Sequence, residues 1–153
     1  MSSSPGLGTR LRLLISALDD AVEQIYREAE LDFRPRFFPC FRLLMARGSL
    51  SVGETARALG VTQPAATQTL QTMARAGLVE AVTGPDRRER RYALSAKAQA
   101  MIPQLQPIWA AADRAATALD AALPHPLGDI VDSALAELSR HDFRARISEE
   151  LKR

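Results

Sequence analysis

A cluster of arginines occupies the stretch TGPDRRERRYALS, residues 83–95. The cluster consists of Arg87, Arg88, Arg90 and Arg91. Such a density of positive charge favours contact with a polyanion, although an isolated charge run is usually just a solvated surface. Turn-forming residues precede the cluster, while Tyr92 and Leu94 behind it alternate as in a strand, so a β-hairpin is predicted to carry it at its tip.

The charge of the chain is concentrated in its middle. The formal net charge is only +2, but residues 31–100 hold 11 Lys/Arg against 5 Asp/Glu. Residues 1–30 and 101–153 each carry a net charge of −2. A polyanionic partner is therefore expected to touch the middle of the chain and not its ends.

The elements that position this cluster follow from hydrophobic periodicity and from start and stop residues. Apolar positions three and four apart predict amphipathic helices near both ends, and Pro103 and Pro107 predict a kink or an interruption in one of them. The predicted helices span 7–30, 36–47, 51–58, 63–76, 96–122 and 127–151, and the predicted strands span 78–82 and 90–94.

Two short helices in the middle are bounded by clear capping signals. Ser51 and Glu54 form a capping box for helix 51–58, and Gly60 suits the left-handed turn after it. Thr62 caps helix 63–76, and Gly77 ends it. The inward positions of that second helix are predicted to be Ala66, Leu70, Met73 and Ala74. Two helices joined by so short a turn indicate a helix-turn-helix, and the hairpin after it is then a wing.

The order of elements resembles the MarR family of bacterial winged-helix transcriptional regulators. The most specific match is Asp-x-Arg followed by Leu-Ser at the start of a helix, here Asp86, Arg88, Leu94 and Ser95. Ala98 stands where that family often has glycine. The resemblance implies a homodimer that binds a pseudo-palindromic operator on double-stranded DNA, most often as a repressor.

The predicted fold class is mainly α (α+β), with one MarR-like domain over residues 1–153. Residues 36–95 are expected to form the winged helix-turn-helix core. Residues 7–30 and 96–151 are expected to form a helical dimerisation region, since their apolar stripes exceed what so small a core can cover.

Helix 63–76 is predicted to enter the major groove with its N-terminus first. Glutamine side chains offer a donor and an acceptor in one plane, which suits adenine, and threonines can meet a thymine methyl or a phosphate. The predicted contacts from this helix are Thr62, Gln63, Thr67, Gln68, Gln71 and Arg75.

The wing is predicted to supply most of the electrostatic affinity, because Arg75 is the one charged residue of helix 63–76. Arg88 is the candidate for a narrow minor groove, and Arg87 and Arg90 are candidates for phosphate contacts. Asp86 is expected to orient a wing arginine. Strand alternation should send some of these arginines, with Arg91 among the candidates, back toward the body of the protein.

Other residues admit two interpretations each. Tyr26, Phe37, Phe41 and Trp109 are candidates for an effector pocket for a small aromatic ligand, or simply for core packing. Cys40 is a peroxide sensor in one interpretation and a buried structural residue, which is favoured, in the other. His125 and His141 lack the spacing of metal ligands, so no metal site is predicted.

No catalytic set and no cofactor-binding motif is apparent, so the chain is not expected to be an enzyme. No apolar run approaches the length of a membrane span, and the single cysteine fits a reducing bacterial cytoplasm, with the protein on the nucleoid. The competing hypothesis is a winged-helix module for protein–protein interaction without sequence-specific DNA binding.

Overall fold

The structure is a computed structural model and describes residues 5–84 and 89–153. The chain divides into two units, Met1–Ile108 and Trp109–Arg153, with the boundary inside one long helix. The first unit contains α1 (Leu7–Glu28), η1 (Pro35–Phe37), α2 (Phe38–Arg47), β1 (Ser49–Ser51), α3 (Val52–Leu59), α4 (Gln63–Arg75), β2 (Val79–Thr83), β3 (Arg90–Leu94) and the start of α5 (Ala96–Ala122). The second contains the rest of α5, α6 (Leu127–Arg140) and α7 (Phe143–Glu150).

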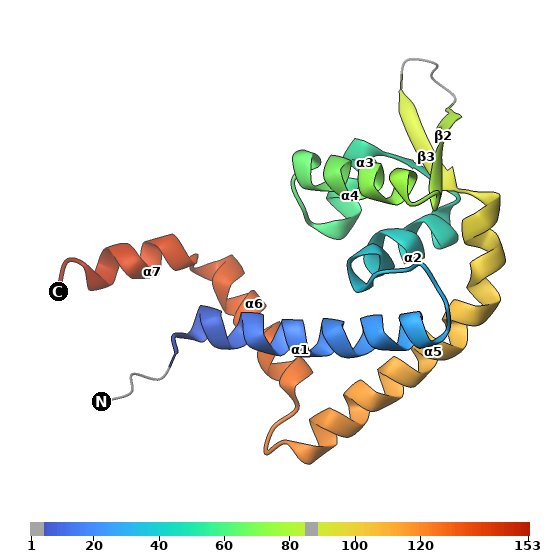
Figure 1. Cartoon of the computed structure of the whole chain (residues 1–153). Helices are drawn as coiled ribbons and strands as arrows, with labels where there is room; N and C mark the ends of the chain where they lie inside the picture. Colours follow the sequence, from blue (N-terminus) through green and yellow to red (C-terminus); the bar gives the residue numbers. More distant parts are fainter. Residues whose placement is uncertain (1–4, 85–88) are drawn as a thin grey trace. The chain divides into compact units, whose positions relative to one another are not determined.

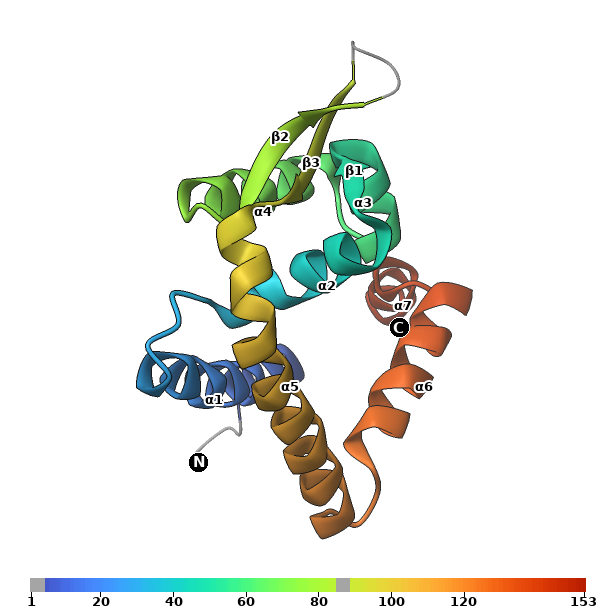
Figure 2. The ribbon, with the colours of Figure 1, turned by 90° about the vertical axis from the view of Figure 1, so that its right-hand side faces the viewer.

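Within the first unit, α3, α4 and the β2–β3 hairpin lie on one side of α2, and α1 lies on the other (Figure 1). The hairpin extends past α3 and α4, as Figure 2 also shows. This is the winged helix-turn-helix arrangement predicted from the sequence. The described part of the chain has no helix long and apolar enough to cross a membrane.

The helix boundaries follow the capping signals. The Ser51 hydroxyl accepts from Glu54 N–H at 3.2 Å while the Glu54 carboxylate accepts from Ser51 N–H at 2.9 Å, so the predicted capping box is confirmed. Thr62 Oγ1 accepts from Ala65 N–H at 3.3 Å and caps α4. Gly60, with φ 66°, occupies the left-handed turn between α3 and α4, where a side chain would be strained.

The sheet is antiparallel, with strand order β1-β3-β2. Its short strand β1 was not predicted, because three residues between Gly48 and a helix cap carry no periodic signal. Strand β1 pairs with β3 from Ser49↔Ala93 to Ser51↔Arg91, and β2 pairs with β3 as far as Thr83↔Arg90. The hairpin therefore leaves the three-stranded part of the sheet at Arg91.

The core of the first unit contains a cluster of aromatic rings around Phe33. Tyr26, Phe37 and Phe41 each meet the Phe33 ring edge-on, with ring centroids 5.1, 6.0 and 5.2 Å away. All four side chains are buried. Edge-to-face packing of this kind is favoured by the charge distribution of aromatic rings. The connection between α1 and α2 is held against the helices by this cluster.

Two predictions at the level of elements are wrong, and one is wrong in part. Ala74 is exposed instead of facing inward, while Ala66, Leu70 and Met73 are buried as predicted. Helix α5 runs through Pro103 and Pro107 without an interruption, and the kink that these prolines also predict stays a prediction. The predicted helix 127–151 is two helices, since His141 is extended and Asp142 begins α7 by accepting a hydrogen bond from Ala145 N–H at 2.8 Å.

Long apolar faces are left uncovered in both units of the described chain. Within α1 only Tyr26 is buried, and neither α6 nor α7 buries any residue. Exposed apolar side chains on these three helices are Leu7, Leu11, Leu13, Ile15, Leu18, Ile25, Ile130, Val131, Leu135, Leu138, Phe143 and Ile147. A monomer would expose far more apolar surface than soluble proteins usually do.

Candidate nucleic-acid interface

The exposed face of α4 carries the predicted DNA-contacting residues. Gln68, Gln71 and Arg75 are exposed and lie three or four positions apart, so they share one side of the helix. Opposite them, Leu70 and Met73 are fully buried and fix the rotation of α4 about its axis. The row of two amides and one guanidinium is thus presented to solvent by a rigidly packed helix.

The N-terminal end of α4 is also open to solvent. Thr62 and Gln63 are exposed, and Thr67 is half-buried. Gln63 leans toward the start of α3, since a Cβ built on Gly53 would lie 3.8 Å from Gln63 Nε2. This first turn is the positive end of the helix dipole, and Thr62 Oγ1 satisfies its Ala65 N–H.

The C-terminal end of α4 is joined to the start of α5. Leu78 N–H donates to Met73 O and Gly77 N–H to Ala74 O, each at 2.9 Å, which is a Schellman ending. Ser95 Oγ donates to Gly77 O at 2.6 Å and accepts from Ala98 N–H at 3.1 Å. A single hydroxyl therefore binds the turn that follows α4 and caps the first turn of α5.

The wing arginines within the described residues have different environments. Arg90 is exposed, and its guanidinium lies 5.4 Å from the centroid of the Tyr92 ring. The Arg91 side chain turns back to the body and is 14% exposed. Strand alternation thus separates two neighbouring arginines as predicted. Asp86, Arg87 and Arg88 lie outside the described residues, so their predicted roles stay predictions.

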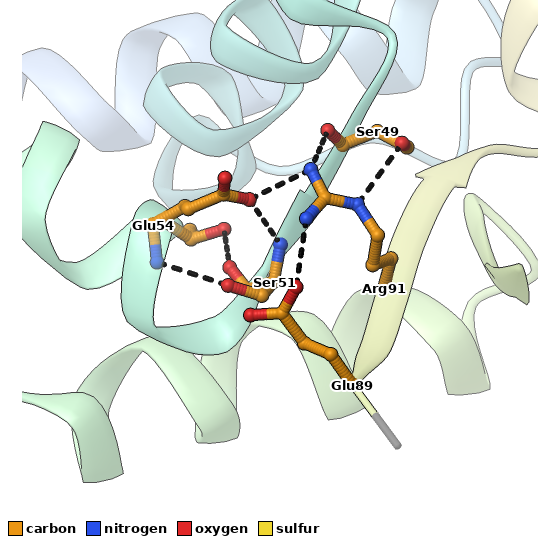
Figure 3. Close-up of polar contacts among 6 residues, drawn as sticks. Ser49, Ser51, Glu54, Glu89 and Arg91 are labelled. Atoms are coloured by element: carbon orange, nitrogen blue, oxygen red, sulfur yellow. Dashed lines mark hydrogen bonds and ion pairs between the residues drawn. The ribbon is translucent and has the colours of Figure 1, made fainter. Parts of the chain in front are cut away.

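Arg91 connects β3 to β1 and to the first turn of α3 (Figure 3). Its Nη2 lies 2.8 Å from Glu54 Oε2, and its Nη1 lies 3.0 Å from Glu89 Oε2. It also donates from Nη2 to Ser49 O at 2.9 Å and from Nε to Ser49 Oγ at 3.4 Å. Sequence reasoning left Arg91 among several candidates, because two of its partners, Ser49 and Glu54, belong to a distant segment of the chain.

This arrangement stabilises the ionised form of the Glu54 side chain. The backbone N–H of Ser51 is the main cause that lowers the pKa of Glu54, and the Arg91 guanidinium lowers it further. A carboxyl whose folded pKa is depressed stabilises the fold above its ordinary pKa, and that contribution is lost as the pH falls through the folded value.

We therefore expect wild-type protein to lose stability on acidification more steeply than Glu54→Gln, in the range below the ordinary Glu54 pKa of 4.5. Urea unfolding at a series of pH values from neutral to acid measures this difference. If the free energy of unfolding fell by the same amount in both proteins over the whole pH range, the role assigned to the Glu54 carboxylate would be contradicted.

Cys40 is buried in α2, and burial raises the pKa of its thiol to about 11. Thiolate is the reactive form, so a thiol with this pKa reacts slowly at neutral pH. We expect Cys40 to stay reduced under mild peroxide while DNA binding is unchanged. Mass spectrometry of the treated protein tests this, and a sulfenic acid or mixed disulfide at Cys40 would contradict it.

The histidines do not gather ligands for a metal. His141 Nε2 lies 3.2 Å from Glu149 Oε1, and His125 is exposed. Among the described residues no group of three or more His, Cys, Asp or Glu side chains could hold an ion.

The candidate effector residues occupy core positions. Tyr26, Phe37 and Phe41 are buried in the Phe33 cluster, and Trp109 is buried in the second unit. Phe37 also lines a cavity of about 180 Å³. The other residues around that cavity are Arg36, Gln68, Thr69 and Thr72.

The sequence model of the MarR family matches residues 38–89, which run from the start of α2 into the wing. This segment belongs to the MarR family. No curated protein matches the sequence.

Solved structures show that the MarR-family fold extends over nearly the whole chain. The Mycobacterium tuberculosis transcriptional regulator MOSR in complex with DNA is 21% identical, with a TM-score of 0.67, covering 90% of this chain and 99% of that one. The Staphylococcus aureus MepR–DNA complex is 16% identical, with a TM-score of 0.66 and coverage of 90% and 98%. Bordetella bronchiseptica BpsR, whose DNA binding is regulated by 6-hydroxynicotinic acid, is 16% identical, with a TM-score of 0.66 and coverage of 91% and 96%.

Proposed function

We propose that this protein is a transcriptional regulator that binds a specific DNA sequence as a homodimer. The observation that carries this proposal is the pairing of a capped, firmly packed α4, whose outer face is polar, with an adjacent cation-bearing hairpin. MOSR and MepR, which share the fold, are DNA-bound in their structures.

The outer face of α4 supplies base recognition in this proposal. Gln68 and Gln71 can pair with adenine through their planar amides, and Arg75 can reach guanine or a phosphate. The N-terminal residues Thr62, Gln63 and Thr67 enter first, where the positive dipole end faces the groove. Because α4 carries little charge, its contribution is to specificity more than to affinity.

The wing supplies the electrostatic part of the affinity. Arg90 is exposed and its guanidinium lies over the face of Tyr92, so it is available to contact a phosphate. Arg87 and Arg88 extend this charge according to the sequence, with Arg88 proposed for the minor groove and Asp86 as its orienting partner. Each phosphate contact contributes about −0.9 to the slope of log affinity against log salt.

A second copy of the chain is the proposed partner of the uncovered faces on α1, α6 and α7. Two-fold symmetry would place two α4 helices on successive turns of the same face of the duplex, and the operator would then be pseudo-palindromic. Such a dimer would act on the nucleoid in the bacterial cytoplasm, with repression as the expected outcome of operator binding.

Control by a small aromatic ligand belongs to the same proposal, supported by the regulation of BpsR by 6-hydroxynicotinic acid. Of the residues predicted for an effector pocket, Phe37 lines the cavity that also touches Gln68 of α4. A ligand could change DNA binding only through different affinities for two dimer geometries.

Selection of bound duplexes from a random pool tests the proposed function. Wild-type protein is expected to enrich a sequence with two inverted half-sites. Gln71→Ala is expected to relax the preference at one base pair of each half-site. The variant should lose about 1–3 kcal/mol of the discrimination that wild-type protein shows for its preferred base at that pair. The control is Gln24→Ala on α1, which lies far from α4 in sequence and should leave the selected motif unchanged. Enrichment of no motif, together with a stable protein partner, would favour the interaction module instead.

A further inference from the structure

Arg91 is unusual for a wing arginine because all of its nitrogen atoms face the protein. The three nitrogens contact Ser49, Glu54 and Glu89 at 2.8–3.4 Å, and the side chain is 14% exposed. These contacts engage four of the five guanidinium N–H groups, so an arginine held this way has little left to offer a phosphate. Its positive charge is already balanced by two carboxylates, so it adds little to the attraction for DNA.

The position of this ion pair in the fold is equally specific. Ser51 is the last β1 residue paired with β3, and its register partner is Arg91. Beyond that point the hairpin continues as two strands only, with Thr83 opposite Arg90. The guanidinium therefore lies at the base of the projecting hairpin, where a small rotation would move the tip by the largest amount.

Glu54 makes the connection to the helix-turn-helix. The same oxygen, Oε2, accepts from Ser51 N–H at 2.9 Å and lies 2.8 Å from Arg91 Nη2. Glu54 belongs to the capping box at the start of α3, which packs against α4. Wing strand, β1 and α3 are thus joined at one carboxylate.

Gly84, the residue after β2, lies against the Arg91 side chain. A Cβ built on this residue would overlap Cδ of Arg91. Since the Arg91 guanidinium is held by three partners, its stem cannot swing aside without breaking those contacts. Glycine is needed here for space, because the chain at Gly84 does not adopt the left-handed conformation.

We propose that Arg91 is a positioning residue, which through Glu54 sets the angle of the wing relative to α4 and so places the exposed wing cations on DNA. The inference rests on the proposed function, in which wing and α4 contact the same duplex together. It assigns to Arg91 a role distinct from that of Arg90, although the two residues are adjacent and equally charged.

The variant Glu54→Gln distinguishes a positioning effect on DNA affinity from the effect of changing the net charge. Glutamine still accepts the Ser51 N–H, so the capping box survives, but the ion pair with Arg91 is lost. Removing a negative charge near DNA should by itself tighten binding. Positioning predicts the opposite sign: affinity for the selected duplex falls about tenfold or more, as expected for residues that act as a unit. Fluorescence anisotropy at fixed salt measures the affinity.

Four further variants complete the experiment, one of which is Arg91→Gln alone. Gly84→Ala changes no charge and should cause a similar loss, whereas Arg91→Gln combined with Glu54→Gln should cost little more than either alone. Arg90→Gln is the matched control for one lost arginine, and it should reduce the salt slope by about 0.9. Glu54→Gln binding as tightly as wild type, or more tightly, would overturn the proposal. So would additive losses in the double variant.

A measurement on the free protein keeps the outcome independent of DNA recognition. Amide hydrogen exchange at Arg91 should accelerate about tenfold or more in Glu54→Gln relative to wild type, because the base of the wing is released. Unchanged exchange overturns the positioning role even if DNA binding is altered. If wild-type protein selects no duplex, the proposed function fails, and accelerated exchange would still show that Arg91 and Glu54 hold the wing.

Discussion

Replacing Leu11 and Leu18 together by glutamate is expected to convert the protein to a monomer and to lower its affinity for the selected duplex at least about a hundredfold. Both side chains are more than 40% exposed, and they lie seven residues apart on one stripe of α1. Charges on that stripe would have to be buried without partners if a second copy covered it. The loss of affinity follows because each half-site would then be bound without the effective concentration that the dimer provides.

The matched control is Leu13→Glu. Leu13 is 62% exposed on the same helix but points away from the stripe, so this variant should remain dimeric and bind DNA normally. Light scattering at several protein concentrations gives the mass, and anisotropy gives the affinity. A wild-type protein that is monomeric at micromolar concentration, or a double variant that stays dimeric, would refute the proposed interface.

Phe33→Ala is expected to destabilise the fold by about 3–5 kcal/mol, the range observed when a buried aromatic ring is removed from a core. Phe33 is 3% exposed and contacts three other rings. Its loss leaves a cavity that the edge-on neighbours cannot close without giving up their geometry. Equilibrium unfolding in urea measures the change.

Phe33→Leu provides the comparison for the same site. Leucine retains much of the buried volume and adds no polar atom, so we expect a cost below about 1.5 kcal/mol. Equal costs for the two variants would show that ring contacts and cavity formation are not what stabilises this part of the molecule.

The sequence predicted the helix-turn-helix accurately because its signals are local. Ser51, Glu54, Gly60 and Thr62 each act on backbone groups within three or four residues, and the structure places all four as expected. The short strand β1 and the break at His141 were missed because they depend on pairing and on competition between caps. Apolar periodicity continued across residues 141–142, although the Asp142 side chain there begins a new helix.

In the candidate nucleic-acid interface, too, the features that depend on local periodicity could be predicted from the sequence. The exposure of Gln68, Gln71 and Arg75 follows from helical periodicity, and the opposite directions of Arg90 and Arg91 follow from strand alternation. Which arginine turns inward could not be predicted, since that depends on Glu54 and Ser49 from a distant segment. The centre of the aromatic cluster, Phe33, lies in a loop and had no periodic pattern to mark it.

The shared hydroxyl of Ser95 has a mechanical consequence. Because it holds the Gly77 carbonyl and the first turn of α5 at once, α4 cannot twist or slide unless the start of α5 moves with it. Lys97, whose ammonium donates to Ala76 O at 2.9 Å, adds a second tether at the same joint. A torque applied to the start of α5 would thereby reach α4, the helix proposed to read the bases, without passing through the hairpin.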